Sequence, residues 1–377
     1  FGPRAANIID LNPHLDYSQS RIAASERNLS VGDPRSIAFR EDGSQAYVAG
    51  MGSNNVVVIQ PNGSRIEEIE VGEGPTGIAL DDSRDRGYVL NRFDGSISVL
   101  NLDNNTETQR VSFFDPTPDV IKLGRKHLYD THSGSGLGQA SCASCHVDAR
   151  TDRLSWDLGN PAGEMVQRNG FTFHPMKGPM KTQTLVDIIG SPSLHHRGDK
   201  DDLFGFASTF SNLHGTESPL DSASMSEFEA FLDSIHYGPN PNRNIDNSLS
   251  TSVAIPGPNG TVRGYADATD GLNSYLTGQG TSSRCASCHL GPRSRNDVRG
   301  PASFIEGQPI AVPSFSGFYD RMGLFWNSTD GSTAGFAIRP DGAQSSEMQA
   351  LDRDFELNTD HGPHVIAFQL SIEGPIP

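Results

Sequence analysis

Residues 141–146 read Ser-Cys-Ala-Ser-Cys-His, and residues 284–289 read Arg-Cys-Ala-Ser-Cys-His. Each copy contains Cys-x-x-Cys-His, which is the attachment pattern of a c-type haem. Two thiols three positions apart can add to the two vinyl groups of one porphyrin, and the histidine that follows can ligate the iron. The sequence therefore predicts two covalently bound haems, held by Cys142, Cys145 and His146 and by Cys285, Cys288 and His289.

The same cysteines could instead form a zinc site, a thioredoxin-like redox pair or structural disulfides. A zinc site built from two cysteine pairs usually separates them by about 15 to 20 residues, whereas Cys142 and Cys285 are 143 positions apart. A redox pair does not need a histidine in the next position. Because the 4 cysteines of the chain all belong to the two motifs, haem attachment accounts for them best.

Composition and charge narrow the class of protein. A chain of 377 residues is long enough for two or three domains, and 40 Gly with 24 Pro predict many turns. The formal net charge of −17 argues against nucleic acid or anionic lipid as a partner. It is compatible with a basic electron donor, and equally with simple solubility.

The sequence also predicts where the protein works. It has no run of about 18 apolar residues, so we expect no membrane span. No signal peptide is visible, and the chain opens at Phe1 rather than at Met. Since haem is attached to this motif on the outer side of the energy-coupling membrane, we expect a processed or partial form of an exported bacterial protein, periplasmic, extracellular or on the cell surface.

Residues 33–112 contain an internal repeat with a period of 41. Ala46-Tyr47-Val48 matches Gly87-Tyr88-Val89, and Pro34 matches Pro75 at the same offset. Short β-rich segments with a period near 40 are typical of propeller blades. The repeat resembles the YVTN-type blade, and we assign residues 1–112 to such blades, with two blades in 33–112 and part of a preceding blade in 1–32. Because propellers need about four to eight blades to close, we expect the missing ones upstream in the chain or in another subunit.

The rest of the chain is expected to form two mainly α-helical cytochrome c-type domains. The prolines of residues 113–118 stop the last strand, and a helix over 120–129 capped by Asp119 follows. A second helix is expected over 224–235. The predicted boundaries are 113–240 for the first haem domain, 241–264 for a linker rich in Pro, Asn, Ser and Gly, and 265–377 for the second haem domain, which ends on the apolar segment 365–370.

From Leu123 onward the chain resembles the bacterial dihaem cytochrome c peroxidase family, which includes the dihaem enzymes of methylamine utilisation, in the branch with an N-terminal YVTN-type β-propeller. The resemblance implies an exported enzyme that reduces hydrogen peroxide, or performs a related haem-based oxidation. Its electrons would come from a donor protein or a small redox carrier and pass between two haems. The segments that carry the resemblance, besides the haem motifs, are 123–130, 174–185, 194–199, 312–315 and 340–342.

The resemblance also suggests the groups around each iron. His174, which lies 28 residues after His146, is the candidate sixth ligand of the first haem and, with His196, the candidate catalytic residue. Arg197 is expected to pair with a haem propionate through bidentate hydrogen bonds. For the second haem the family has Met or a substitute, so Met348 is the candidate ligand. The alternatives left open are His195 for the first haem and Met322, His361 and His364 for the second. No role is assigned to His14, His127, His132, His214 or His236.

Three positions depart from the family pattern. His196 stands where the family has a tryptophan between the haems, and Lys181 stands where an asparagine helps to hold calcium. A cation at that position argues against the calcium ion that the family implies. The Glu-Met pair that places a carboxylate over the reactive haem is not evident between 200 and 236. A pure electron-transfer cytochrome with a propeller docking module therefore remains the alternative.

Overall fold

The computed structural model describes residues 8–168, 170–191, 193–256, 261–279, 285–289, 299–300, 309–320, 325–326, 333–334 and 360–373. The chain folds into two compact units. Unit 1 comprises Phe1–Ala149 and Phe204–Ser234, and unit 2 comprises Arg150–Leu203 and Ile235–Pro377. Residues 150–203, which we expected in the first haem domain, therefore belong to the same unit as the second Cys-x-x-Cys-His.

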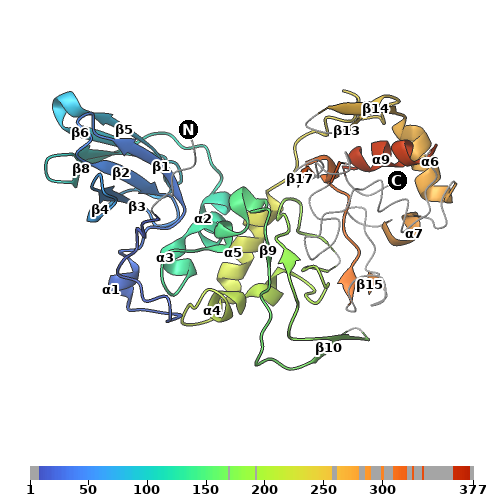
Figure 1. Ribbon diagram of the computed structural model, residues 1–377, viewed down its shortest axis with the longest axis horizontal. Helices are drawn as coiled ribbons and strands as arrows, with labels where there is room; N and C mark the ends of the chain where they lie inside the picture. Colours follow the sequence, from blue (N-terminus) through green and yellow to red (C-terminus); the bar gives the residue numbers. More distant parts are fainter. Residues whose placement is uncertain are drawn as a thin grey trace. The chain divides into compact units, whose positions relative to one another are not determined.

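The sequence repeat forms two four-stranded antiparallel sheets in unit 1, with strand orders β1-β2-β3-β4 and β5-β6-β7-β8 (Figure 1). Tyr47 lies opposite Ala38 and Val58, and Tyr88 lies opposite Ala79 and Val99, all at the offset of 41. The prediction of two equivalent four-stranded blades is thus confirmed. The strands are β1 Pro34–Phe39, β2 Ala46–Gly50, β3 Asn55–Ile59, β4 Arg65–Glu70, β5 Pro75–Asp81, β6 Arg86–Asn91, β7 Ser96–Asn101 and β8 Thr106–Ser112.

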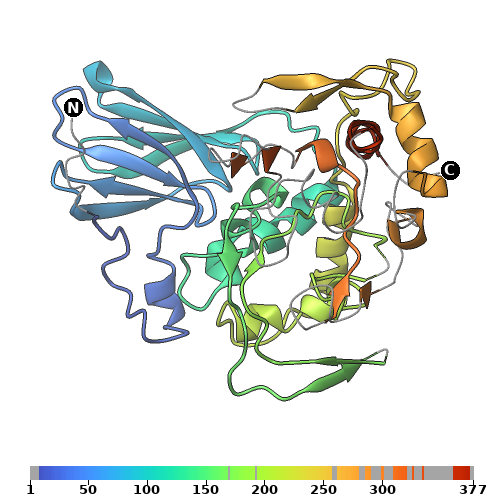
Figure 2. The same cartoon turned by 45° about the vertical axis from the view of Figure 1, so that its right-hand side comes forward.

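The two sheets share one hydrophobic core, and Figure 2 shows them side by side. Tyr47 is 0 % exposed and packs in a cluster with Val58 from its own sheet and Val89 and Leu100 from the other. Its hydroxyl donates a hydrogen bond of 2.7 Å to Asn105 Oδ1. Burying each of these side chains is worth about 1.5 to 3 kcal/mol, so the blades stabilise one another.

The two longest helices of unit 1, α2 Asp119–Tyr129 and α5 Ser222–Asp233, pack against each other. A Cβ atom at Gly124 would overlap the Glu227 carbonyl and the Phe231 side chain, so only glycine allows this close approach. Asp221 accepts a hydrogen bond from the Ser224 amide and starts α5 two residues before the expected position. Asp119 does not cap α2 as predicted, because Pro118 takes the N-cap position and Asp119 is the first helical residue.

Unit 2 contains a similar pair, α6 Ala268–Thr277 and α9 Gly362–Leu370. A Cβ atom at Gly271 would overlap the His364 carbonyl and the Phe368 side chain. The apolar segment expected at 365–370 is therefore the buried part of a helix. It packs on Tyr275, whose ring lies edge-on to Phe368 with 5.0 Å between the centroids.

The remaining described elements are short. Part of the predicted linker is ordered, because Val253–Pro256 (β13) pairs with Val262–Ala266 (β14). Within the described residues, no helix has the length and apolar composition that crossing a membrane requires. The other elements are α1 Ala24–Arg27, η1 Asp82–Arg84, α3 Thr131–Gly134, η2 Cys142–Ser144, η3 Val147–Ala149, β9 Ser155–Trp156, β10 Val166–Arg168, β11 Phe171–Phe173, β12 Met180–Lys181, η4 Leu203–Phe206, α4 Thr209–Asn212, α7 Ala286–His289, β15 Arg299–Gly300, β16 Ile310–Ala311, η7 Phe318–Asp320, β17 Phe325–Trp326 and β18 Thr333–Ala334.

Candidate functional site

The first Cys-x-x-Cys-His forms a single tight turn in unit 1. The Ser141 amide donates to Ser144 Oγ at 3.0 Å, and the His146 amide donates to the Cys142 carbonyl at 2.9 Å. The Cys142, Cys145 and His146 side chains are all half-buried. The turn therefore gathers the two sulfur atoms and the imidazole within five consecutive residues.

The protonation of Cys142 bears on the chemistry that the motif can support. Burial and, to a smaller extent, the neighbouring Cys145 raise the pKa of the Cys142 thiol to about 12. A thiol in a disulfide-exchange pair needs a pKa near or below neutral, because the thiolate is the nucleophile. In this arrangement Cys142 stays protonated at neutral pH, which argues against a thioredoxin-like redox pair.

The second motif lies on α7 in unit 2 and shows how its histidine is held. The His289 amide donates to the Cys285 carbonyl at 3.0 Å, and His289 Nδ1 lies 3.0 Å from the Pro313 carbonyl. The imidazole stacks on Phe315, with 4.3 Å between the centroids and 22° between the planes. Since a carbonyl only accepts, Nδ1 carries the proton and the lone pair is on Nε2. Histidines that ligate metals usually donate their other ring N–H in this way.

His214 lies near the first motif, although its sequence context predicted no role for it. Burial lowers the pKa of His214, and the charge of His146 lowers it further, while the Gly134 backbone opposes the shift. Its own backbone is fixed, because the His214 carbonyl accepts from the Gly136 amide at 2.8 Å. No sequence signal marks this residue, because it is 68 positions from His146. Only in the folded chain is His214 close enough for the charge of His146 to affect its pKa.

His174 is exposed and follows β11 in unit 2. Its Nδ1 lies 3.0 Å from the Met176 amide nitrogen and 3.3 Å from the Met176 carbonyl oxygen. A proton on Nε2 leaves Nδ1 to accept from the amide, whereas a proton on Nδ1 can be donated to the carbonyl and leaves Nε2 free to ligate. His146 and His174 belong to different units, so their predicted pairing on one haem stays a prediction.

His196 and Arg197 are buried beside this loop, and both form hydrogen bonds within the protein. His196 Nε2 donates to the Lys181 carbonyl at 2.9 Å. Arg197, which is 4 % exposed, donates from Nη1 to the His174 carbonyl at 2.7 Å and from Nη2 to Asp199 at 3.2 Å. The structure thus brings Arg197 and His174 together, and the arginine holds the loop in place. Its expected contact with a haem propionate stays a prediction.

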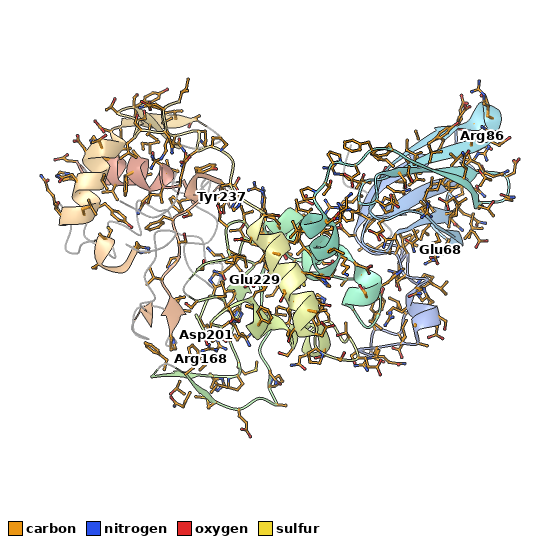
Figure 3. The ribbon with its side chains drawn as sticks, turned by 180° about the vertical axis from the view of Figure 1, so that it is seen from behind. Glu68, Arg86, Arg168, Asp201, Glu229 and Tyr237 are labelled. Atoms are coloured by element: carbon orange, nitrogen blue, oxygen red, sulfur yellow. The ribbon has the colours of Figure 1, made fainter. Side chains whose placement is uncertain are left out.

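Asp199 is the acceptor at the centre of this group of cations. Burial by itself would raise the pKa of Asp199, but the hydrogen bond from His195 Nδ1, at 2.6 Å, and the charge of Arg197 together hold it well below its usual range. Burial also lowers the pKa of His195. Arg168 donates to the Asp199 carbonyl and pairs with Asp201, and Figure 3 labels both partners of this ion pair.

The ligand candidates for the second haem are only partly described. Met348 and Met322 lie outside the described residues, as does the segment 340–342. His361 Nδ1 lies 3.3 Å from Ser274 Oγ, and His364 Nδ1 accepts from the Asp267 amide at 3.1 Å. Both histidines therefore contact the helix α6 or its N-cap. Among the described residues, no three His, Cys, Asp or Glu side chains form a group that could hold a metal ion.

Comparisons with known proteins do not assign the chain to a family. No protein-family model matches it. Two curated proteins from Mycobacterium sp. strains KMS and MCS, each named "Putative S-adenosyl-L-methionine-dependent methyltransferase", are 29 % identical over 110 residues, which is 29 % of this chain. The chain thus matches about a third, 32 %, of the length of these curated relatives.

Solved structures give equally limited likenesses. Hydrazine synthase of Kuenenia stuttgartiensis pressurised with xenon is 13 % identical with a TM-score of 0.41, covering 69 % of this chain and 89 % of that one. Apo AztD of Citrobacter koseri is 19 % identical with a TM-score of 0.19 over 21 % of this chain and 24 % of that one. Dihydro-haem d1 dehydrogenase NirN is 22 % identical with a TM-score of 0.20 over 23 % of this chain and 18 % of that one. At these TM-scores, none of them supports a conclusion about this chain.

Proposed function

We propose that this chain is an exported dihaem c-type cytochrome that reduces hydrogen peroxide or performs a related haem-based oxidation. The observation that carries the proposal is the repeated setting of the two Cys-x-x-Cys-His motifs. Each motif follows a helix with a glycine at its contact with a later helix. Gly124 contacts the carbonyl of Glu227 and the ring-bearing side chain of Phe231, and Gly271 contacts the same groups of His364 and Phe368. In both later helices the two residues are four positions apart. Two similar helical frames with one motif each support one haem per frame.

The residues of both motifs fit a covalently attached haem. Cys142 and Cys145 would form the thioethers of the first haem and His146 its iron ligand, while Cys285, Cys288 and His289 would serve the second. The hydrogen bond from His289 Nδ1 to the Pro313 carbonyl already selects the tautomer that iron ligation needs. When bound, the two haems would supply electron storage and transfer together with a site that activates peroxide.

Reduction of hydrogen peroxide to two water molecules takes up two electrons and two protons, and the chain's own residues must deliver the protons. His174 is exposed, so its imidazole can exchange protons with solvent. Arg197 fixes the backbone of His174 through the carbonyl, and Asp199 fixes Arg197 in turn. His196 donates to Lys181 and borders the same loop. We assign proton delivery to His174 and the positioning of its loop to Arg197.

A cytochrome that only transfers electrons is the second candidate, and His214 favours it. If His214 and His146 both held the first iron, that iron would have no free site for peroxide. The missing Glu-Met pair between 200 and 236 supports the same conclusion. Turnover of peroxide with a reduced electron donor distinguishes the two functions, since only the peroxidase consumes peroxide at a rate proportional to the enzyme.

The second blade offers a surface for further blades. The first blade packs on the second through three buried side chains, Tyr47, Val56 and Val58. The equivalent side chains of the second blade are only partly buried; they are Tyr88, Ile97 and Val99. The same apolar pattern therefore faces outward from the second blade, with Tyr88 36 % exposed. We propose that a further blade, from upstream in the chain or from another subunit, packs on this face.

A photo-crosslinking experiment tests the blade proposal. Tyr88→p-benzoylphenylalanine should crosslink to a peptide with the blade repeat when the protein is expressed in full length in its own cells. The same replacement at Asp103, in a turn, is the control and should give no such crosslink. Crosslinks only to unrelated proteins, or none, would contradict the proposal.

The cofactor proposal is tested on the purified protein. We expect the pyridine haemochrome spectrum to give two haems per chain. After denaturation, the intact mass should still exceed the mass of the polypeptide by two haem groups. Zinc or the bare polypeptide mass would refute it.

A further inference from the structure

Unit 2 contains a cavity of about 340 Å³ that no part of the proposed function uses. Its functional groups come from Asp187, Tyr237, Tyr319 and Glu373, and Gly238, Pro239 and Gly317 complete the lining. These residues are far apart in the sequence and meet only in the folded unit. The volume is within the range of about 300 to 1,000 Å³ that small-molecule sites have.

Hydrogen bonds fix the acidic side chains of this cavity in place. Asp187 has a left-handed backbone with a φ of 56°. Its carboxylate accepts from His236 Nδ1 at 2.8 Å and from the Tyr237 amide at 3.2 Å. Glu373 accepts from the Asn240 amide at 2.7 Å. Because these contacts hold both carboxylates, a ligand would meet a site that is already formed.

The aromatic side chains are fixed as well. Tyr237, labelled in Figure 3, and Tyr319 lie edge to face with 6.2 Å between the ring centroids. The Tyr319 hydroxyl donates to the Gly238 carbonyl at 3.2 Å. The Tyr237 hydroxyl is buried and has no hydrogen-bond partner among the described residues. Because this oxygen is buried beneath its neighbours, a ligand in the cavity would meet the tyrosine rings and not the hydroxyl.

The charge of the lining favours a cation. It contains two carboxylates and no lysine or arginine. Arg150 pairs with Asp320 and its guanidinium lies 6.0 Å from the centroid of the Tyr237 ring, while Arg243 donates to the Ser371 and Asn247 carbonyls. Arg243 lies 3.9 Å from Glu373, at the limit of an ion pair. A bare metal ion is a poor match, because the described residues offer no group of three His, Cys, Asp or Glu there.

We propose that this cavity binds an organic primary ammonium ion. Its N–H groups would donate to the carboxylates of Asp187 and Glu373. Its carbon body would lie against the Tyr319 ring and Pro239, where an aromatic ring also attracts a cation. The proposal is independent of haem and of peroxide chemistry, so neither depends on the other.

Calorimetric titration of the purified full-length protein with benzylammonium tests this site. We expect one ion bound per chain. Benzyl alcohol, which has the same body without the charge, and benzoate should bind at least about tenfold more weakly, because a hydrogen bond to a charged group contributes about 1.5 to 3 kcal/mol. Tetramethylammonium, which has no N–H donor, should also bind more weakly.

Two variants with a matched control locate the binding. Asp187→Asn keeps the shape and tolerates the left-handed backbone. Asp187→Asn and Glu373→Gln should each weaken the binding of benzylammonium at least about tenfold. Asp246→Asn removes an equal charge from an exposed turn in the same unit and should leave the affinity unchanged. The proposal is wrong if wild-type protein with a normal circular dichroism spectrum binds no benzylammonium. It is also wrong if benzyl alcohol binds equally well, or if Asp246→Asn weakens binding as much as Asp187→Asn.

Discussion

The glycine at each helix crossing gives the sharpest test of the fold. In Gly271→Ala, the added methyl group would overlap the His364 carbonyl and Phe368 at the point where α6 meets α9. Overpacking of this kind costs about 1 to 3 kcal/mol, and the position is more costly than usual because one neighbour is backbone. Alanine recovers up to about 1 kcal/mol through its higher helix propensity. We therefore expect a net loss of about 2 kcal/mol in the local stability of this helix pair.

Hydrogen–deuterium exchange measures that loss helix by helix, which matters because a chain of two units need not unfold in one step. A change of about 2 kcal/mol corresponds to roughly 30-fold faster exchange in peptides from α6 and α9. Peptides from α2 and α5 should be unaffected, and Gly124→Ala should give the reverse pattern. Gly264→Ala is the control, since a Cβ atom there has no neighbour within 4 Å. Wild-type exchange rates in Gly271→Ala would show that the close approach of α6 and α9 does not exist.

Three further predictions concern the haem motifs and the group around Asp199. Cys142→Ala and Cys285→Ala should each weaken attachment of one haem and leave the other, as intact-mass measurement would show; loss of both haems together would contradict independent sites. If His174 ligates the first iron, His174→Gly should produce a high-spin electron paramagnetic resonance signal from that haem. If His214→Ala produces this signal and His174→Gly does not, His214 is the ligand instead. Because the pKa of Asp199 is lowered in the folded chain, its ion contacts stabilise the fold above the ordinary carboxyl pKa of 3.8 and are lost as pH falls below it. Hydrogen–deuterium exchange in peptides from 166–203 should therefore accelerate in acid. The acceleration should be smaller in Asp199→Asn.

The sequence predicted those features that depend on local pattern. The offset of 41 placed Tyr47 and Tyr88 correctly because each blade repeats the same strand, and the apolar segment 365–370 forms the buried part of α9. The start of α2 was misplaced because Pro118, with its fixed φ, took the cap position that Asp119 was expected to fill.

Features that depend on contacts across the chain were not visible in the sequence. Gly124 and Gly271 have no distinctive neighbours in the sequence, and only the crossing helices show why each is glycine. His214 was overlooked for the same reason, since its relation to His146 is tertiary. The cavity at Asp187 and Glu373 combines residues from distant segments, so spacing could not have indicated it.

The discontinuous unit 1 constrains how the protein is made. Its blades are complete by residue 112, but α2 finds its partner α5 only after the chain has passed through residues 150–203 and returned. At a synthesis rate of about 5 to 20 residues per second, the 85 residues between 149 and 234 take roughly 4 to 17 s to emerge. During that interval the blades can fold while the helix that precedes the first Cys-x-x-Cys-His has no partner. A fragment cut at residue 149 would be left in this state permanently, whereas a fragment that extends to 234 contains both halves of unit 1.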